Sequence, residues 1–247
     1  MKHKLKHIFM RLTDAVILLA IVSLIIYSLI LNSSPKVSVS NTVYGNIDKY
    51  QAKIARGMKP FGQHNKITFD KTRVLQALQA SFPEVASVNI DLPLISHKAS
   101  VNVVVSPPAF RLASNQSVYI VDSDGVVVAE ASTYPTLSNL PLITDQSGFQ
   151  ATVGKTVFDT NSINFVNQLL VQLKHYKISI AKMILPPRAE ELDLTASDHS
   201  YFVKFYLAGD PLTQIGRYLA ARSYFHSHHI QPSQYLDVRV SGKLFYK

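Results

Sequence analysis

The chain has 247 residues, of which 47% are hydrophobic and 17% are charged, and its formal net charge is +9. This length allows one or two domains of ordinary size, and the apolar fraction is too high for a disordered protein. The chain contains no cysteine, which excludes a disulfide framework, a thiolate metal site and a cysteine nucleophile. The positive charge favours anionic partners such as lipid head groups, nucleic acid or acidic wall polymers.

A basic tail and a long apolar run open the chain. Four Lys and Arg residues lie within residues 1–11, and Ala15–Leu31 then contains no charge. At ~1.5 Å per residue the run spans roughly 25 Å, and extension back to Leu12 gives about 30 Å, the thickness of one hydrocarbon core. We therefore expect a cytoplasmic tail over residues 1–11 and a transmembrane helix over residues 12–31. The positive flank predicts a single-pass type II protein of the plasma membrane, with everything after Leu31 outside the cell membrane.

A cleaved signal peptide is the alternative interpretation of this segment. Signal peptides have apolar regions of about 7–15 residues, followed by small residues at the cleavage site. The run here is longer, and Asn32-Ser33-Ser34-Pro35 is a poor cleavage site, which favours a retained anchor. Residues 1–14 carry three of the nine net positive charges, so the exported part keeps +6. That excess is mild for a nucleic-acid-binding stripe, and we expect no nucleic acid as partner.

Residues 32–107 are expected to form a small α+β unit. Apolar and polar residues alternate in three short segments, which predicts strands. Two segments carry apolar stripes at helical spacing, and the second stops at Pro83 because the residue before proline avoids the helical region. The expected elements are a strand at Val37–Val39, a helix at Asn46–Gly57, a helix from Asp70 to Phe82, and strands at Val88–Leu92 and Val101–Val105.

Residues 108–247 are expected to form a second unit, mostly antiparallel sheet with two helices. Asp122-Ser123-Asp124-Gly125 lies between apolar runs and predicts a hairpin turn. A helical stripe follows at Ile163, Val166, Leu170 and Leu173. Asp210-Pro211 predicts the start of the second helix, because Asp accepts from free N–H groups and proline fits the first turn. We expect its buried face to contain Leu212, Ile215, Leu219 and Phe225. A short extended piece is expected at Leu140–Ile143, and strands at Ile178–Leu185, Glu191–Leu194, Tyr201–Leu207, Tyr235–Val240 and Lys243–Lys247.

No set of residues with catalytic spacing is found. Gly148 and Gly154-Lys155-Thr156 have five residues between their glycines, whereas a phosphate-binding loop needs four. Two S-x-x-K sequences lack the companion motifs of penicillin-binding enzymes. Asp122, Asp124 and Gly125 resemble the start of a calcium loop without its other ligands, and His226 with His229 lacks a third metal ligand nearby in sequence. We expect no enzyme activity, no cofactor, no metal and no small-molecule substrate.

Several motifs occur in an order that resembles one family. Four of these motifs resemble the core of a POTRA domain: Phe82–Val85, Val88–Ile90, Leu92-Pro93 and Ala99–Val105. Proteins with this core often have an aromatic residue at the position of Leu92. The later motifs are Val121–Val126, Leu140–Leu142, Leu207–Asp210 and Tyr235–Val240, followed by Gly242. Together they resemble the FtsQ/DivIB family of bacterial cell-division proteins. The resemblance implies a POTRA domain of order β-α-α-β-β over residues 32–107 and an FtsQ-type β domain over residues 108–247.

The resemblance also implies a function and partners. FtsQ/DivIB proteins are non-enzymatic scaffolds at the division septum. They dock the FtsB–FtsL complex by β-strand addition and help regulate septal peptidoglycan synthesis by FtsW and FtsI, and their POTRA domain is linked to recruitment through FtsK. By resemblance, the chain is expected to have FtsB- and FtsL-like partners, with FtsK, FtsW and FtsI as further ones.

The C-terminal segment is the candidate binding site. A terminal strand can lie at a sheet edge and offer unpaired N–H and C=O groups to a partner strand; the alternative is a strand buried within the sheet. Deletion of Lys243–Lys247, or proline at Phe245, is expected to abolish partner binding and to leave the fold intact. The expected partner-binding residues are Arg239, Val240, Gly242, Lys243, Leu244, Phe245, Tyr246 and Lys247.

A membrane-anchored extracytoplasmic sensor or wall-polymer-binding module is the alternative function. The +6 charge of the exported part favours it, because wall polymers and lipids are acidic. An outer-membrane assembly factor would need a large barrel after its POTRA domain, and the remaining chain has neither the length nor the pattern for one.

Overall fold

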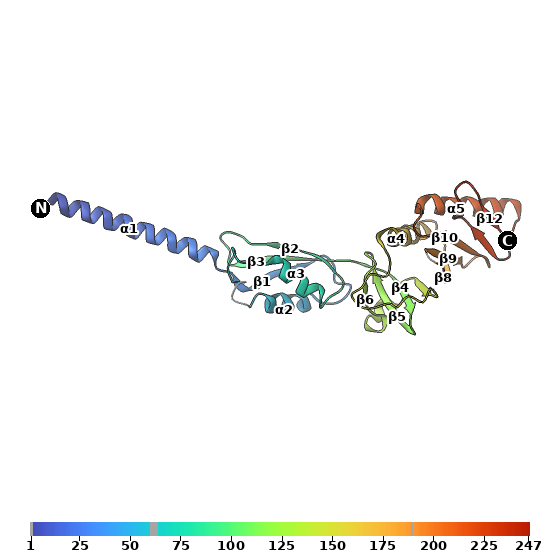
Figure 1. Cartoon of the computed structure of the whole chain (residues 1–247), viewed down its shortest axis with the longest axis horizontal. Coiled ribbons are helices and arrows are strands. Elements are labelled where there is room, and N and C mark those ends of the chain that lie inside the picture. The colour runs from blue at the N-terminus through green and yellow to red at the C-terminus, as the bar shows by residue number, and fades with distance from the viewer. Residues whose placement is uncertain (1, 60–63, 189) are drawn as a thin grey trace. The chain divides into compact units, whose positions relative to one another are not determined.

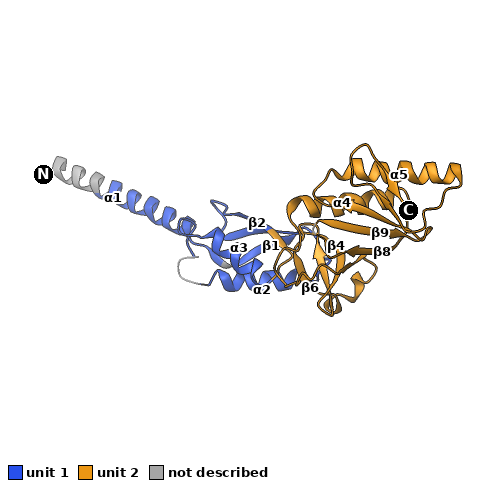
Figure 2. Cartoon of the chain, turned by 45° about the vertical axis from the view of Figure 1, so that its right-hand side comes forward, with its two compact units in different colours: residues 1–81, 87–105 blue, residues 82–86, 106–247 orange. Residues whose placement is uncertain are grey.

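The structure, a computed structural model, describes residues 2–59, 64–188 and 190–247 (Figure 1). The side chains of residues 1–11 and of Ser33 are outside this description, and with them the basic residues of the predicted tail. The chain is of the predicted α+β class, with helices and two sheets. It divides into two compact units, residues 1–81 with 87–105 and residues 82–86 with 106–247 (Figure 2).

The first helix, α1 (Lys2–Leu29), contains the predicted apolar run. Its segment Leu12–Leu29 is long and apolar enough to cross a membrane, by length and composition, and none of that segment is buried against the protein. The helix ends at Leu29, two residues before the predicted end. The cause is local pairing, because Ile30 forms an isolated β-bridge with Asn65 and the Leu31 N–H donates to the carbonyl oxygen of His64 at 2.7 Å.

The first unit has the predicted element order of strand, helix, helix, strand, strand. Its elements are β1 (Asn32–Val39), α2 (Ile47–Gly57), α3 (Lys71–Gln79), β2 (Val85–Asp91) and β3 (Lys98–Val105). The sheet order is β1-β3-β2, with β1 parallel to β3. Asp70 begins α3 as predicted, since its carboxylate accepts from the Arg73 N–H at 3.0 Å. The helix ends at Gln79, before the predicted Phe82, so the turn around Pro83 lies outside it.

Residues at the start of β2 belong to the second unit by their contacts. Glu84 is buried, and its carbonyl oxygen accepts from the Ser106 N–H at 3.0 Å. Phe82–Ala86 are therefore grouped with the chain after Val105, whereas the sequence analysis placed them in the first unit.

The second unit is built on a nine-stranded sheet of order β12-β11-β10-β9-β8-β7-β4-β5-β6. Helices α4 (Thr160–His175) and α5 (Pro211–His228) pack into one core with the sheet and lie on the same side of it (Figure 2). Two short 3-10 helices, Ala131–Thr133 and Pro135–Leu137, follow β6. The strands are β4 (Pro108–Ser114), β5 (Ser117–Asp122), β6 (Val127–Glu130), β7 (Leu142–Asp145), β8 (Ile180–Leu185), β9 (Glu191–Ala196), β10 (Phe202–Tyr206), β11 (Tyr235–Asp237) and β12 (Phe245–Tyr246).

The sheet is mixed, with more parallel pairing than the sequence indicated. β4 with β7, β7 with β8, and β10 with β11 are parallel, and the other pairs are antiparallel. Parallel neighbours need a crossover connection. Helix α4 provides it between β7 and β8, and α5 provides it between β10 and β11. The two helices thus explain two of the three parallel pairs, and the chain from β5 through the two 3-10 helices forms the connection between β4 and β7.

The predicted hairpin turn after β5 is confirmed. β5 and β6 pair antiparallel, and one oxygen of the Asp122 carboxylate accepts from the N–H groups of Asp124 at 3.0 Å and Val126 at 2.9 Å. Gly125 has φ +81, a left-handed conformation that glycine adopts without strain. Asp122 therefore organises a turn within the protein.

The buried faces of the two long helices differ from the predicted ones. Leu212 of α5 is 57% exposed, and Leu170 of α4 is only half-buried. On α5 the buried positions are Gln214, Ile215, Tyr218, Ala221 and Phe225. The buried face includes Gln214 because its side-chain amide hydrogen-bonds the backbone at the end of β10. The amide donates to the Tyr206 carbonyl oxygen at 2.8 Å and accepts from the Tyr206 N–H at 2.9 Å.

Candidate partner-binding edge

The C-terminal strand β12 lies at the end of the nine-stranded sheet, next to β11. It contains Phe245–Tyr246, fewer residues than the predicted Lys243–Lys247, and β11 ends at Asp237 and not at Val240. The segment between β11 and β12 turns away from the sheet after Asp237, because Arg217 of α5 binds it. The Arg217 guanidinium donates to the carbonyl oxygens of Val238 at 2.8 Å and Val240 at 3.1 Å. Gly242, with φ +70, then reverses the chain.

Backbone pairing at the C-terminus determines which groups face the open edge. The N–H of Lys247 donates to the Tyr235 carbonyl oxygen at 3.1 Å, and the N–H of Tyr235 donates back at 3.3 Å. Antiparallel ladders alternate between pairs that exchange both bonds and pairs that exchange none. Asp237 with Phe245 is then a bonded pair, and Leu236 with Tyr246 is a non-bonded one. The backbone N–H and C=O groups of Tyr246 therefore point away from β11, as do those of Leu244 by the same alternation.

Side chains on one face of β12 form a groove with helix α5. Tyr246 packs edge-on against Phe225, with ring centroids 5.1 Å apart, and Leu244 packs half-buried against the core. The groove has a volume of about 450 Å³ and lies directly beside the outward backbone groups. Its lining residues are Arg217, Ala220, Ala221, Tyr224, Phe225, Gly242, Lys243, Leu244 and Tyr246. The α5 residues of this groove were not predicted as site residues, because sequence analysis treated Phe225 as core only.

Other predicted site residues surround the edge without lining this groove. Phe245 is 48% exposed and, by strand alternation, its side chain lies on the face opposite to Tyr246. Val240 is 45% exposed in the connection, and Lys247 is exposed at the end of the strand. The predicted residues from Val240 to Lys247 are thus gathered at one edge of the sheet.

Arg239 differs from the other predicted residues, because its guanidinium is used within the chain. It donates to both carboxylate oxygens of Asp237, at 2.9 and 2.6 Å, and to the carboxylate of Glu191 on β9. Glu191 is only 4% exposed and also lies 3.8 Å from the ammonium of Lys204. Burial works against ionisation of Asp237, but the hydrogen bonds from Arg239 outweigh it and lower the pKa of that carboxyl. Arg239 therefore fastens β11 to β9 and positions the edge from behind.

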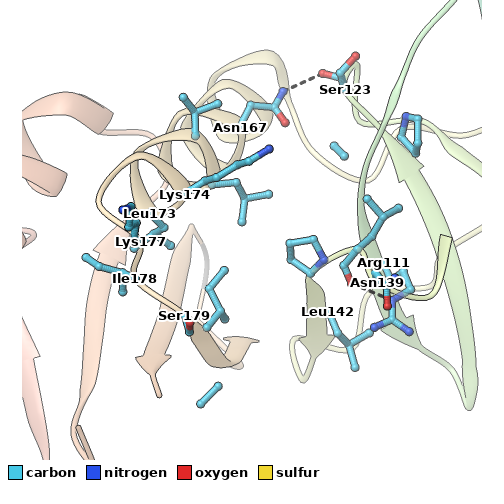
Figure 3. A pocket seen from close by; sticks show the side chains of 18 residues that line it. Arg111, Ser123, Asn139, Leu142, Asn167, Leu173, Lys174, Lys177, Ile178 and Ser179 are labelled. Carbon is cyan, nitrogen blue, oxygen red and sulfur yellow. Dashed lines mark hydrogen bonds between the residues drawn. The ribbon is translucent and has the colours of Figure 1, made fainter. Parts of the chain in front are cut away.

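A second groove lies between α4 and the strands β4, β7 and β8, with a volume of about 1170 Å³. Figure 3 shows Lys174 reaching from α4 into the space that Arg111 faces from β4. Lys177 lines the same groove, and the lining residues that the structure describes include no Asp or Glu. One end is closed by the amide of Asn167, which donates to the Ser123 carbonyl oxygen at 2.9 Å. The groove thus combines three cations with apolar side chains such as Leu170 and Leu142.

The histidines and the glycine that the sequence analysis considered for metal and nucleotide binding lie at a helix end and in a turn. No three His, Cys, Asp or Glu side chains among those residues come together as a metal site. His226 and His229 lie exposed at the end of α5, where His229 adopts φ +55 as the helix C-cap. The Gly154 N–H donates to the Val127 carbonyl oxygen at 2.8 Å, so this glycine is part of a turn beside β6.

Comparison with protein-family models and with the curated proteins finds no match to this chain. The edge of β12, the two grooves and the apolar helix α1 are the features of the molecule that bear on its function.

Proposed function

We propose that this protein is a non-enzymatic, single-pass membrane scaffold of the FtsQ/DivIB type, which docks an FtsB–FtsL complex by β-strand addition at β12. In this proposal α1 is the plasma-membrane anchor, the first unit is a POTRA domain, and both units lie on the extracytoplasmic side at the division septum. The protein would thereby help regulate septal peptidoglycan synthesis by FtsW and FtsI, with FtsK as a contact of the first unit. The observation that carries the proposal is the open edge of β12.

The edge offers what a partner strand needs. The outward N–H and C=O groups of Tyr246 and Leu244 can each exchange bonds with an added strand, which would become the tenth of the sheet. Backbone bonds supply affinity but little selectivity, because every strand carries the same groups. Selectivity needs side-chain contacts next to the ladder.

The groove between α5 and β12 supplies such contacts. A side chain that points from the added strand toward α5 would meet Tyr246, Leu244 and Phe225, all apolar on that face. An aliphatic or aromatic residue of the partner suits this groove. Lys243 and Lys247 flank the segment that contains Leu244 and Tyr246. Their positive charges disfavour pairing with another basic strand, such as β12 of a second copy of the chain. These lysines favour an acidic residue on the partner strand.

Affinity purification of the full-length chain tests the proposal. The tagged protein is extracted from its membranes in detergent, and the co-purifying proteins are identified by mass spectrometry. The proposal predicts small bitopic FtsB- and FtsL-like proteins in the wild-type sample, and their loss when Tyr246 is replaced by proline. Recovery of those partners in equal amounts with both proteins would refute strand addition at this edge. In dividing cells, a fluorescent fusion is expected at the septum, and uniform membrane distribution would argue against the divisome assignment.

The groove of Arg111, Lys174 and Lys177 is the observation that favours the alternative function, a wall-polymer-binding module. Three cations around a groove without carboxylates suit an anionic polymer. Sedimentation of the protein with purified wall material, at low and high salt, distinguishes this function from the first. Strong salt-sensitive binding that Lys174→Glu with Lys177→Glu abolishes would support it, and unchanged sedimentation of that variant would reject it.

A further inference from the structure

Three apolar side chains at the tips of two loops in the first unit are unusually exposed. Ile95 is 93% exposed, Leu94 is 82% exposed and Ile67 is 74% exposed. Among the exposed large hydrophobic side chains of the described residues, these three have the highest values, above those of the segment Leu12–Leu29 of α1. Single exposed apolar residues are common, but three on neighbouring loops indicate an interaction surface. We name Ile67, Leu94 and Ile95 the apolar tips.

The two loops are bonded to each other. The ammonium group of Lys66, the residue before Ile67, donates to the carbonyl oxygens of Pro93 and Leu94, the latter at 2.8 Å. Lys66 is half-buried. Because its ammonium group donates to two carbonyl groups of the other loop, it holds the two loops together. The two loops that carry the apolar tips are therefore held to each other by this side chain.

The same loops are bonded to the end of α1. The Lys66 N–H donates to the Leu29 carbonyl oxygen at 2.9 Å, and Nδ1 of His97 lies 2.8 Å from the Ile30 carbonyl oxygen. The His97 ring also meets the Tyr27 ring edge-on, with centroids 4.5 Å apart. These contacts place both loops beside the last turn of the helix, where the apolar segment Leu12–Leu29 ends. If that segment spans a membrane, the loops lie at the membrane surface.

We infer that the apolar tips insert into the lipid bilayer beside α1, so that the first unit has a second, peripheral membrane contact. This inference rests on the proposed membrane anchor and commits to lipid as the occupant. The tips lie beside the end of α1, so they continue its apolar surface sideways at the depth where the helix would leave the hydrocarbon. Tyr27, His97 and Lys98 lie at the same level, and aromatic and basic residues of this kind are typical of the membrane interface.

The contact has a consequence for the orientation of the first unit. A domain joined to a membrane helix by one strand can pivot, whereas insertion at a second point beside the helix restricts tilting. β1 begins at Asn32, at the same level as the tips, and leads away from them to Val39. Insertion would hold this strand upright, and with it the sheet of the first unit.

Tryptophan quenching in vesicles tests the inference, since the chain contains no tryptophan of its own. The full-length protein is reconstituted into phospholipid vesicles with brominated acyl chains, as the single variants Ile95→Trp and Leu94→Trp. Tyr27→Trp reports the helix itself. Val43→Trp is the matched control, because Val43 is exposed in the same unit but follows the far end of β1. The tip positions tolerate tryptophan because their side chains contact little of the protein.

The inference predicts loss of fluorescence in brominated vesicles for Ile95→Trp and Leu94→Trp, close to that of Tyr27→Trp, and none for Val43→Trp. If Tyr27→Trp is quenched but Ile95→Trp and Leu94→Trp stay as bright as Val43→Trp, the inference is overturned. The membrane anchor proposed for α1 would still be supported by that result. Absence of quenching in Tyr27→Trp would instead overturn the anchor, and the inference with it. Quenching of Val43→Trp equal to that of the tips would also overturn it, because the contact would then not be confined to the tips.

Discussion

Lys247 and Tyr235 exchange both of their backbone hydrogen bonds, at 3.1 and 3.3 Å, and this pairing sets the direction of every backbone group in the last strand. Phe245 is two residues away and bonds inward to β11, whereas Tyr246 lies between them and its N–H and C=O groups point outward. The distinction refines the sequence-based expectation, in which proline at Phe245 would leave the fold intact. Proline at Phe245 removes an N–H that the sheet itself uses.

Replacement of Tyr246 by proline therefore tests strand addition more cleanly. We expect weaker binding of the FtsB–FtsL-like partner by about tenfold or more, because one intermolecular backbone bond is lost and the ring obstructs the edge. Tyr246→Thr is the matched control, since it removes the same side chain and keeps the N–H. Affinities from biolayer interferometry should fall further for proline than for threonine. Equal affinities of the two variants would contradict the backbone mechanism.

Phe245→Pro is expected to act on the fold of the edge. Loss of an internal ladder bond should lower the free energy of unfolding by roughly 1–3 kcal/mol. Chemical denaturation of the detergent-solubilised chain measures the change, with Phe245→Thr as the control that keeps the N–H. An unchanged midpoint for the proline variant would show that the assigned alternation of inward and outward groups is wrong.

Removal of the Arg239 guanidinium should destabilise the second unit. Arg239→Met leaves the buried carboxylate of Glu191 with its weaker contacts to Lys204 and Arg188. Breaking a buried ion pair from one side commonly costs about 3–5 kcal/mol, and the partial exposure of Arg239 reduces this to roughly 2–4 kcal/mol. The double variant Arg239→Met with Glu191→Gln should recover part of the loss in denaturant unfolding. A double variant less stable than the sum of its single changes would contradict this assignment.

Asp122 should make the stability of the second unit dependent on pH. Burial raises the pKa of its carboxyl from 3.8 to about 6, despite the N–H groups of Val126 and Asp124 that favour the charged form. A carboxyl whose pKa is higher in the folded state stabilises the fold at low pH, and this contribution is lost as the pH rises from about 4 through about 6.

The variant Asp122→Asn isolates this effect, because asparagine is neutral and its oxygen can still accept from both N–H groups. We expect wild type and variant to have similar stability near pH 4, and the variant to be more stable at pH 7 by roughly 1–3 kcal/mol. The difference between the two proteins is the relevant quantity, since burial also raises the pKa of Asp193 to about 6. A difference that does not change between pH 4 and 7 would contradict the assigned pKa.

Gln214 should matter more for α5 than its polar character suggests. Gln214→Met keeps the volume but leaves the Tyr206 N–H and C=O groups without the amide that now pairs both. We expect a loss of roughly 1–3 kcal/mol in unfolding free energy. Leu212→Met on the exposed side of the same helix is the control and should change stability by less than about 0.5 kcal/mol.

Local signals predicted local structure well in this chain. The helix starts at Asp70 and Asp210 follow from carboxylates that bond the first turn, and the hairpin at Asp122 follows from a short polar turn between apolar runs. The position of β12 at the end of the sheet agrees with the expectation that the terminal strand lies at a sheet edge.

Contacts between distant residues could not be predicted in the same way. Arg239 and Glu191 are 48 positions apart, and only the parallel return of β11 beside β10 brings them together. Leu212, which was expected on the buried face, is exposed, and Gln214 is buried because its amide pairs two backbone groups at the end of β10, which helical periodicity does not reveal. The groove beside Tyr246 likewise depends on how α5 packs over the sheet.

Backbone amide exchange, measured with and without the purified FtsB–FtsL-like complex, tests the central claim most directly. The account predicts slower exchange of the Leu244 and Tyr246 amides in the complex, with little change at Phe245 and Lys247, which already bond to β11. Protection at alternate residues is the signature of a strand added to this edge. Binding that leaves Leu244 and Tyr246 exchanging as in the free protein would contradict it.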